Sequence, residues 1–237
     1  MSLSQLPEQM IEAISMLPKH LPVVLITRHS LREVVQGRGL AGYDLQLTSD
    51  GIVLAQAWGE YLATQGIVIK TITTSPIQRC VDTSHHMLVG TGQNPSAGLK
   101  HACSALFVEP GSFVVDIEQA SPSFKAYGAL GFINAFLAGR VAGMKTVRQG
   151  VCDILTKVYQ LTQQGHGLHL VVTHDTILAV IYAYLAKVNV LDQAEWPHMM
   201  EGMFVWFEGQ DFLKSEMVWL WRGQISRIST QEIFHTI

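Results

Sequence analysis

The sequence predicts an α/β protein with a central, mainly parallel sheet and helices on both of its faces. Two observations carry this prediction. Three short segments, at 23–27, 68–74 and 168–173, are predicted to be strands, and the first is continuously apolar and β-branched, as expected of a strand buried on both faces. Each is followed by a segment with helical periodicity, and this repeated strand–helix order is typical of a three-layer α/β/α arrangement.

Length and composition indicate a single globular domain over residues 1–237. The chain is 48% hydrophobic and only 15% charged, which excludes a globally disordered protein. The formal net charge is −3, and the few Lys and Arg residues are scattered. Because proteins that bind nucleic acid usually carry a basic stripe, we expect no nucleic-acid partner.

The N-terminal segment and the cysteines bear on localisation. Residues 1–20 lack the basic start and continuous apolar run of a secretory signal, and apolar residues at helical spacing between 10 and 17 indicate a short amphipathic helix. The apolar runs are shorter than a membrane span. Three cysteines are too few and too spread for a disulfide framework. We therefore expect a cytoplasmic protein without a membrane partner.

Capping signals locate the helices that follow the first two strands. In "LTSDG", Thr48 or Ser49 is suited to the N-cap, and Gly66 marks the expected end of that helix. In "SPIQRC", Ser75 is predicted to cap the next helix and Pro76 to occupy its first position.

The pattern loosens between residues 90 and 143, where Gly, Pro and Ser recur. We interpret this segment as an insert over the carboxyl ends of the strands, with one or two short helices near 124–138. Helical periodicity returns over 147–161, and a further helix follows the third strand. The closing segments "GMFVWFEG" and "SEMVWLWRG" alternate like antiparallel strands. Whether they form the surface of a homodimer or lie buried stays open.

The ends of the three buried strands collect the side chains that can do chemistry. Ligands of such folds bind outside the carboxyl ends of the strands, so these side chains should meet in one crevice. Arginine forks match phosphate oxygens, and a helix N-terminus adds attraction for an anion. The residues expected in this crevice are Arg28, His29, Arg32, Arg79, His174 and Asp175.

A phosphate-binding site alone does not need histidines. A neutral imidazole held in a fixed orientation can attack phosphorus and form a covalent phosphohistidine. Arginines would stabilise the charge on the oxygens of the transferring group, and a carboxylic acid would protonate the leaving alcohol. On this reasoning His29 is the candidate nucleophile.

Four segments, "TRHSLRE", "LTSDGIVLAQAWGEYL", "TSPIQRCVDTS" and "VVTHDTILA", resemble the ordered motifs of the histidine phosphatase superfamily. The resemblance covers most of the chain and implies the phosphoglycerate mutase-like fold. It also implies chemistry that needs no metal or organic cofactor. By this resemblance His29 is the phosphorylated residue, Arg28, Arg32 and Arg79 bind phosphate, and His174 is the second histidine of the phosphate pocket.

The chain departs from the family pattern at two places. Ser30 stands where the family usually has glycine, and the second histidine lies in "HD", as in the acid phosphatase branch. The general acid therefore has two candidates. Glu109, roughly thirty residues beyond Arg79 as in the mutase branch, is favoured. Asp175 is the alternative, although it could instead cap the helix that begins at Thr176.

The sequence therefore predicts a metal-independent phosphatase that hydrolyses a phosphomonoester through a phosphohistidine on His29. Its substrate would be a phosphorylated small molecule or a phosphoprotein, and its product inorganic phosphate. Two alternatives share the fold. One is a phosphoglycerate-type phosphomutase, and the other is a non-catalytic phosphate-binding or scaffold protein. The physiological substrate is not encoded in any motif that we recognise.

Overall fold

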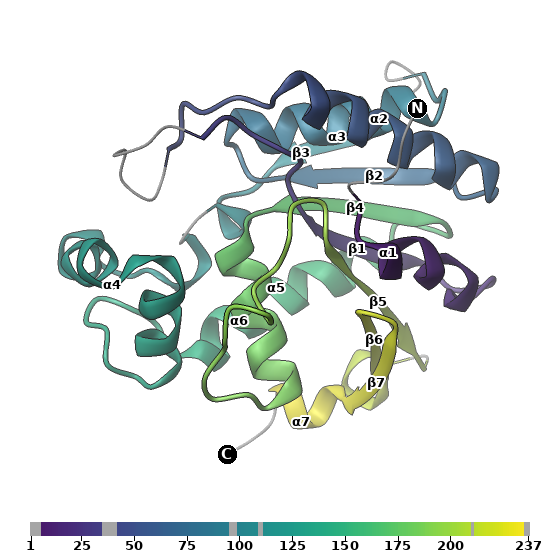
Figure 1. Ribbon diagram of the computed structural model, residues 1–237. Coiled ribbons are helices and arrows are strands. Elements are labelled where there is room, and N and C mark those ends of the chain that lie inside the picture. Colours follow the sequence, from purple (N-terminus) through teal and green to yellow (C-terminus); the bar gives the residue numbers. More distant parts are fainter. Residues whose placement is uncertain (1–5, 35–41, 95–98, 109–110, 210, 235–237) are drawn as a thin grey trace.

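A single twisted sheet forms the centre of the molecule in the computed structural model, which describes residues 6–34, 42–94, 99–108, 111–209 and 211–234 (Figure 1). Within these ranges the sheet has seven strands in the order β3-β2-β4-β1-β5-β6-β7. They are β1 (Val23–Arg28), β2 (Ile69–Thr74), β3 (Lys100–Cys103), β4 (Leu168–Thr173), β5 (Gly202–Glu208), β6 (Glu216–Trp221) and β7 (Gln224–Ser229).

The centre of the sheet is parallel, as predicted. Strand β1 pairs in parallel with β4, with Leu25 opposite Leu170 and Arg28 opposite Thr173. Strand β2 pairs in parallel with both β4 and β3, whereas β5, β6 and β7 extend the sheet on the other side as antiparallel strands. The register places the carboxyl ends of β1, β2 and β4 at one edge, and the predicted site residues follow these ends.

Helices cover both faces of the sheet, which confirms the three-layer prediction (Figure 1). The helices are α1 (Glu8–Ala13), α2 (Ser49–Thr64), α3 (Gln78–Gly90), α4 (Ile117–Leu137), α5 (Val147–Thr162), α6 (Asp175–Ala186) and α7 (Thr230–Phe234). Helices α1, α2 and α3 share one hydrophobic core with the sheet, and α4, α5 and α6 share the other.

Strand β1 shows why its sequence is almost continuously apolar. Successive strand residues point to opposite faces, and Leu25 and Ile26 enter the two different cores with 0% exposure each. Full burial of a side chain of this size contributes about 1.5–3 kcal/mol. A polar residue at either position would therefore be costly, whichever face it pointed to.

The capping predictions are confirmed for α2 and wrong for α3. The Thr48 hydroxyl oxygen accepts a hydrogen bond from the Gly51 amide, and Gly66 follows the helix end with a left-handed φ of 72°. Helix α3 begins at Gln78, and its N-cap residue Ile77 makes no side-chain capping bond. Ser75 lies before the helix, and its hydroxyl oxygen is 2.9 Å from His174 Nε2.

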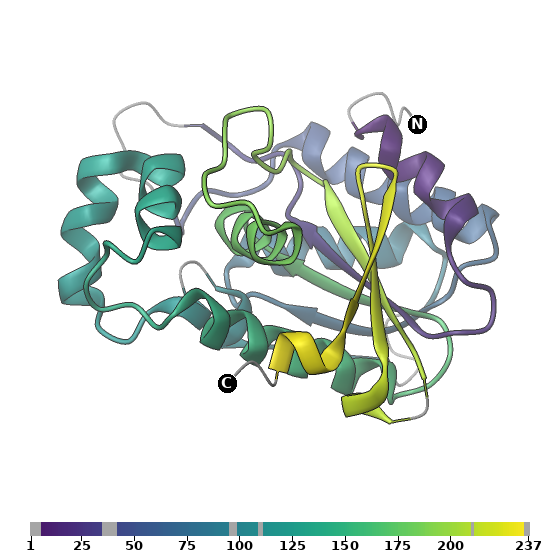
Figure 2. The same ribbon diagram turned by 90° about the horizontal axis from the view of Figure 1, so that it is seen from below.

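The insert is more regular than its composition suggests. It contains β3, a short and exposed edge strand that has no apolar pattern to reveal it. Helix α4 begins seven residues earlier than the predicted range, at Ile117, and breaks at Gly128, where φ is 67° and ψ is 177°. Both ribbon views show α4 standing beside the sheet as a separate projection (Figures 1 and 2).

The insert starts where the central strands end. The Thr173 hydroxyl group, at the end of β4, donates to the Phe107 carbonyl at 2.8 Å. The Ser104 amide donates to the Thr74 carbonyl, at the end of β2, at 2.9 Å. These contacts attach the insert to the edge of the sheet that carries the predicted site.

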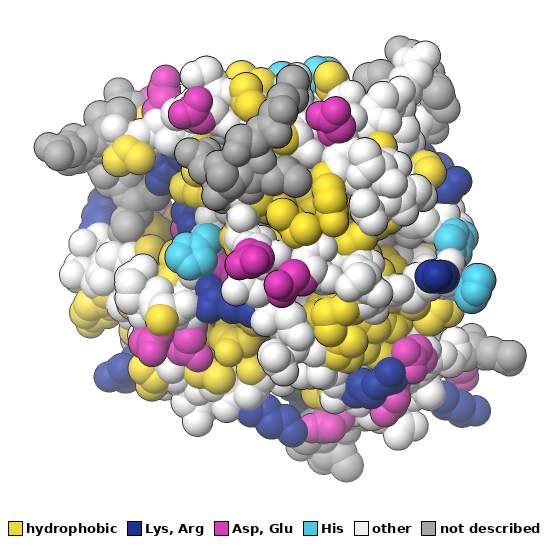
Figure 3. All heavy atoms as spheres, turned by 45° about the vertical axis from the view of Figure 1, so that its right-hand side comes forward, with side chains coloured by type: hydrophobic (Ala, Val, Ile, Leu, Met, Phe, Trp, Pro, Cys, Tyr) yellow, Lys and Arg dark blue, Asp and Glu magenta, His cyan; other side chains and the backbone are white. Residues whose placement is uncertain are grey.

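The face seen in Figure 3 mixes acidic and basic side chains and has no basic stripe. Among the helices in the described ranges, none combines the length and the apolar character needed to cross a membrane.

Candidate active site

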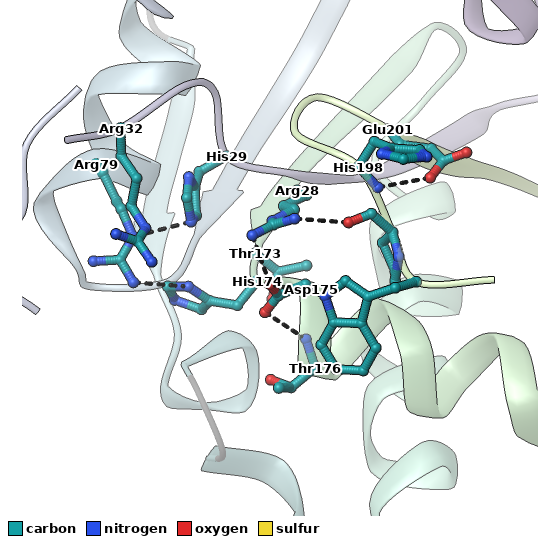
Figure 4. Close-up of polar contacts among 12 residues, drawn as sticks. Arg28, His29, Arg32, Arg79, Thr173, His174, Asp175, Thr176, His198 and Glu201 are labelled. Carbon is teal, nitrogen blue, oxygen red and sulfur yellow. Dashed lines mark hydrogen bonds and ion pairs between the residues drawn. The ribbon is translucent and has the colours of Figure 1, made fainter. Parts of the chain in front are cut away.

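Two histidines from neighbouring strand ends lie at the centre of the site (Figure 4). His29 follows β1, and its amide donates to the Thr173 carbonyl at 3.0 Å, which places it beside His174 at the end of β4. The two ring centroids are 5.5 Å apart, and the ring planes form an angle of 71°. The exposed fractions of His29 and His174 are 2% and 1%. The predicted meeting of these residues is therefore observed.

The contacts of His29 fix which ring nitrogen has a free electron pair. Its Nδ1 lies 2.8 Å from the Ser30 carbonyl oxygen, which can only accept a hydrogen bond. Nδ1 therefore carries the proton of the neutral ring, and Nε2 has the lone pair. The Arg79 Nε–H donates to this Nε2 at 3.0 Å. This lone pair has a fixed direction, and it becomes available for attack on phosphorus when the Arg79 Nε–H exchanges Nε2 for another acceptor.

Burial and neighbouring charges keep both rings neutral. Burial lowers the pKa of His29 well below its usual value, and the positive charge of Arg28 lowers it further. Burial lowers the pKa of His174 to about 3, with Arg79 as the next cause. Both imidazoles are therefore uncharged near neutral pH.

Arg79, near the start of α3, lies between the two histidines with an exposed fraction of 2%. Its Nη2 group is 3.4 Å from His174 Nδ1, and its Nη1 group donates to the Gly42 carbonyl at 2.9 Å. The guanidinium thus places a positive charge next to the candidate nucleophile. Arg32 lies on the same side of His29 and is partly exposed (Figure 4).

Arg28 lies on the other side of His29 and is held by two acceptors (Figure 4). Its Nη2 group forms an ion pair with the Asp175 carboxylate at 2.6 Å, and its Nη1 group donates to the Pro197 carbonyl at 2.7 Å. Trp196 Nε1 donates to the same carboxylate oxygen at 3.2 Å, and the Thr176 amide donates to the other at 2.9 Å. The Asp175 carboxyl group thus accepts from three donors.

Ser30 fits at its position without backbone strain. It is fully buried, and it is not among the described residues with a positive φ. Its amide donates to the Thr83 hydroxyl at 3.0 Å, and its own hydroxyl donates to the Gly51 carbonyl at 2.8 Å. The serine hydroxyl therefore links the nucleophile loop to the first turn of α2.

Of the two candidate acids, Asp175 lies within the described residues and Glu109 does not. Asp175 directly follows His174 and forms an ion pair with Arg28.

Several contacts of the site were not expected from the sequence. Ser75 was interpreted as a helix cap, although it faces His174 at 2.9 Å. The indole N–H of Trp196 contacts Asp175. Both contacts join segments far apart in the chain, and no local pattern signals them.

Comparison with known proteins agrees with this arrangement. Residues 24–99 match the family model of the histidine phosphatase superfamily, branch 1. This segment includes His29, Arg32 and Arg79. No curated protein sequence matches the chain.

Solved structures with the same fold come from several organisms. A mycobacterial glucosyl-3-phosphoglycerate phosphatase is 18% identical, with 78% of this chain and 90% of that chain covered and a TM-score of 0.51. A protein described as mycobacterial hydrolase 2 is 17% identical, with 90% of this chain and 95% of that chain covered and a TM-score of 0.58. A phosphoglycerate mutase from Bacillus anthracis is 12% identical, with 90% of this chain and 96% of that chain covered and a TM-score of 0.54. These likenesses establish the phosphoglycerate mutase-like fold.

Proposed function

Because residues 24–99 match the histidine phosphatase superfamily within a phosphoglycerate mutase-like fold, we propose that this protein is a phosphatase that hydrolyses a phosphomonoester. One observation carries the proposal. A buried, neutral histidine directs the lone pair of Nε2 at the Arg79 guanidinium, with a second neutral histidine 5.5 Å away. This geometry suits an imidazole nucleophile beside a group that binds phosphoryl oxygens.

The proposed reaction has two steps. His29 Nε2 attacks phosphorus, the bond between phosphorus and the leaving oxygen breaks, and a phosphohistidine forms. The hydrogen bond from Nδ1–H to the Ser30 carbonyl stabilises the positive charge that develops on the ring. Water then attacks the phosphohistidine, which releases inorganic phosphate and restores the neutral ring. The groups that would hold the phosphoryl oxygens are Arg28, Arg32, Arg79 and His174.

Glu109 is the proposed general acid, and Asp175 is the alternative. The match to branch 1 covers residues 24–99, and the resemblance places the acid of the mutase branch roughly thirty residues beyond Arg79, which supports Glu109. The contacts of Asp175 support a different role for it, because its oxygens already accept from Arg28, Trp196 and the Thr176 amide. Asp175 would then orient Arg28 beside the nucleophile.

The two acids can be separated by the leaving group. Loss of the general acid should slow hydrolysis of an alkyl phosphate far more than that of p-nitrophenyl phosphate, since nitrophenolate leaves without a proton. We expect this selective loss in Glu109→Gln. Asp175→Asn should slow both substrates to a similar extent. The reverse pattern would assign the acid to Asp175.

A phosphomutase is the second candidate function, because a solved structure with this fold is a phosphoglycerate mutase. It would use the same nucleophile and return the phosphoryl group to a bound product instead of to water. A phosphatase releases phosphate when no acceptor molecule is present, whereas a phosphomutase does not, so this measurement distinguishes the two functions.

The proposed substrate is a phosphorylated small molecule or a phosphoprotein, in the cytoplasm. The test of the proposed function is phosphate release from p-nitrophenyl phosphate over about pH 4 to 8, with a chelator present. We expect turnover by the wild-type protein and none by His29→Ala. Phosphate or phosphoester binding by a well-folded wild type, with no turnover on a panel of phosphoesters, would instead support a binding or scaffold protein.

A further inference from the structure

The ring of His174 is held at both nitrogens. Its Nδ1 lies 3.4 Å from Arg79 Nη2, and a guanidinium can only donate, so Nδ1 has the lone pair. The proton of the neutral ring is therefore on Nε2, which lies 2.9 Å from the Ser75 hydroxyl oxygen. Cys80 Sγ lies 3.7 Å from the same nitrogen and is the weaker partner.

Ser75 is itself fixed in place. It directly follows β2, is fully buried, and its amide donates to the Val172 carbonyl of β4 at 2.9 Å. Its hydroxyl oxygen also accepts from the Ile77 amide at 3.3 Å. The hydroxyl therefore meets His174 from a rigid part of the sheet. Because a hydroxyl can donate or accept, it can pair with Nε2 in either neutral form of the ring.

We propose that Ser75 is a positioning residue for phosphoryl transfer, whose hydroxyl group holds the His174 ring so that Nδ1 faces Arg79 and the phosphoryl group. This inference rests on the proposed function. Ser75 acts through His174 and does not touch the substrate. When Nδ1 donates to a phosphoryl oxygen, Nε2 accepts from the Ser75 hydroxyl. One proton leaves Nε2 to solvent and one joins Nδ1, so the ring charge does not change.

The activity test compares three variants. Ser75→Ala should lower kcat/KM for p-nitrophenyl phosphate by about tenfold, the size expected for one buried hydrogen bond. Cys80→Ala, which removes the weaker contact to the same nitrogen, is the matched control and should have little effect. Ser75→Thr keeps the hydroxyl group and should recover most of the loss.

The structural test uses nitrogen NMR of histidine side chains and needs no turnover. In the wild type without phosphate, we expect His174 Nε2 to carry the proton and Nδ1 to lack it. Adding inorganic phosphate should exchange these two roles. In Ser75→Ala, both ring nitrogens should show a mixture of the two forms. Thermal unfolding establishes whether Ser75→Ala is folded. If the variant is unfolded, the proton positions of His174 in the wild-type spectra test the proposal on their own.

Two results would overturn the proposal. One is a wild-type His174 with its proton on Nδ1 in the absence of phosphate. The other is a folded Ser75→Ala with wild-type kinetics and wild-type ring signals. If the wild type has no phosphatase activity but the predicted proton positions are found, the proposed function fails and the role of Ser75 in holding His174 stands.

Discussion

At the residue scale, the buried histidines link the site to stability. In the unfolded chain a histidine has a pKa near 6.5, whereas burial lowers that of folded His174 to about 3. As pH falls below about 6.5, the unfolded state takes up a proton that the folded state does not. Folding stability contributed by the neutral ring is therefore complete above pH 6.5 and is lost progressively between 6.5 and about 3.

This linkage gives a prediction for His174→Asn. When the pH is lowered from about 7.5 to 5.5, the unfolding free energy of both proteins should fall. The fall should be about 1.4 kcal/mol larger in the wild type, because the variant lacks the histidine that takes up a proton only in the unfolded state. Urea unfolding at several pH values measures the difference. Equal pH slopes for wild type and His174→Asn would contradict the prediction.

Ser30 is one of the two departures from the pattern of the superfamily that the sequence resembles, and its hydroxyl group has a structural role. Ser30→Gly removes the hydrogen bond to the Gly51 carbonyl and adds backbone freedom to the unfolded chain. We expect a loss of about 1–2 kcal/mol in unfolding free energy with phosphatase activity retained. Chemical denaturation measures the unfolding free energy, and steady-state kinetics measure the phosphatase activity. A gain in stability would mean that the hydroxyl group does not contribute as described.

At the element scale, an ion pair attaches the segment between α6 and β5 to the turn between β6 and β7. Glu201, with an exposed fraction of 3%, pairs with Arg222 Nε at 2.7 Å. Arg222 also donates to the carbonyls of Ala194 and Trp196 at 2.6 and 3.1 Å. The same segment supplies the Pro197 carbonyl that holds Arg28. The hairpin between β6 and β7 thereby supports the proposed phosphate site from a distance.

We expect Arg222→Met to disturb both stability and substrate binding. It leaves the Glu201 carboxylate buried without its partner, which costs about 3–5 kcal/mol. It also frees the segment that orients Arg28, so KM for p-nitrophenyl phosphate should rise. Arg227→Met is the matched control, since this arginine of β7 pairs with Glu208 and Glu216 at the surface and should matter little. Equal KM values for the two variants would refute the support role.

At the scale of the whole molecule, the parts that the sequence predicted are those encoded by local patterns. Apolar runs predict the buried strands, and a parallel sheet brings their carboxyl ends to one edge. That rule alone places His29, Arg79 and His174 together. Strand β3 was missed because its four residues are exposed and have no apolar periodicity.

The supporting contacts of the site could not be predicted in this way. Ser75 meets His174 across 99 positions, and Arg222 meets the carbonyls of Ala194 and Trp196 across 28 and 26. Such contacts depend on how strands pair and how helices dock, not on the spacing of residues in the chain.

The phosphohistidine on His29 is the step on which the proposed reaction depends. Rapid acid-free quenching of the protein with radiolabelled p-nitrophenyl phosphate, followed by peptide mapping, measures it. We predict a label that is stable in base, labile in acid and located on the peptide that contains His29, with none in His29→Ala. Label on any other residue, or rapid phosphate release by His29→Ala at the wild-type rate, would contradict the mechanism.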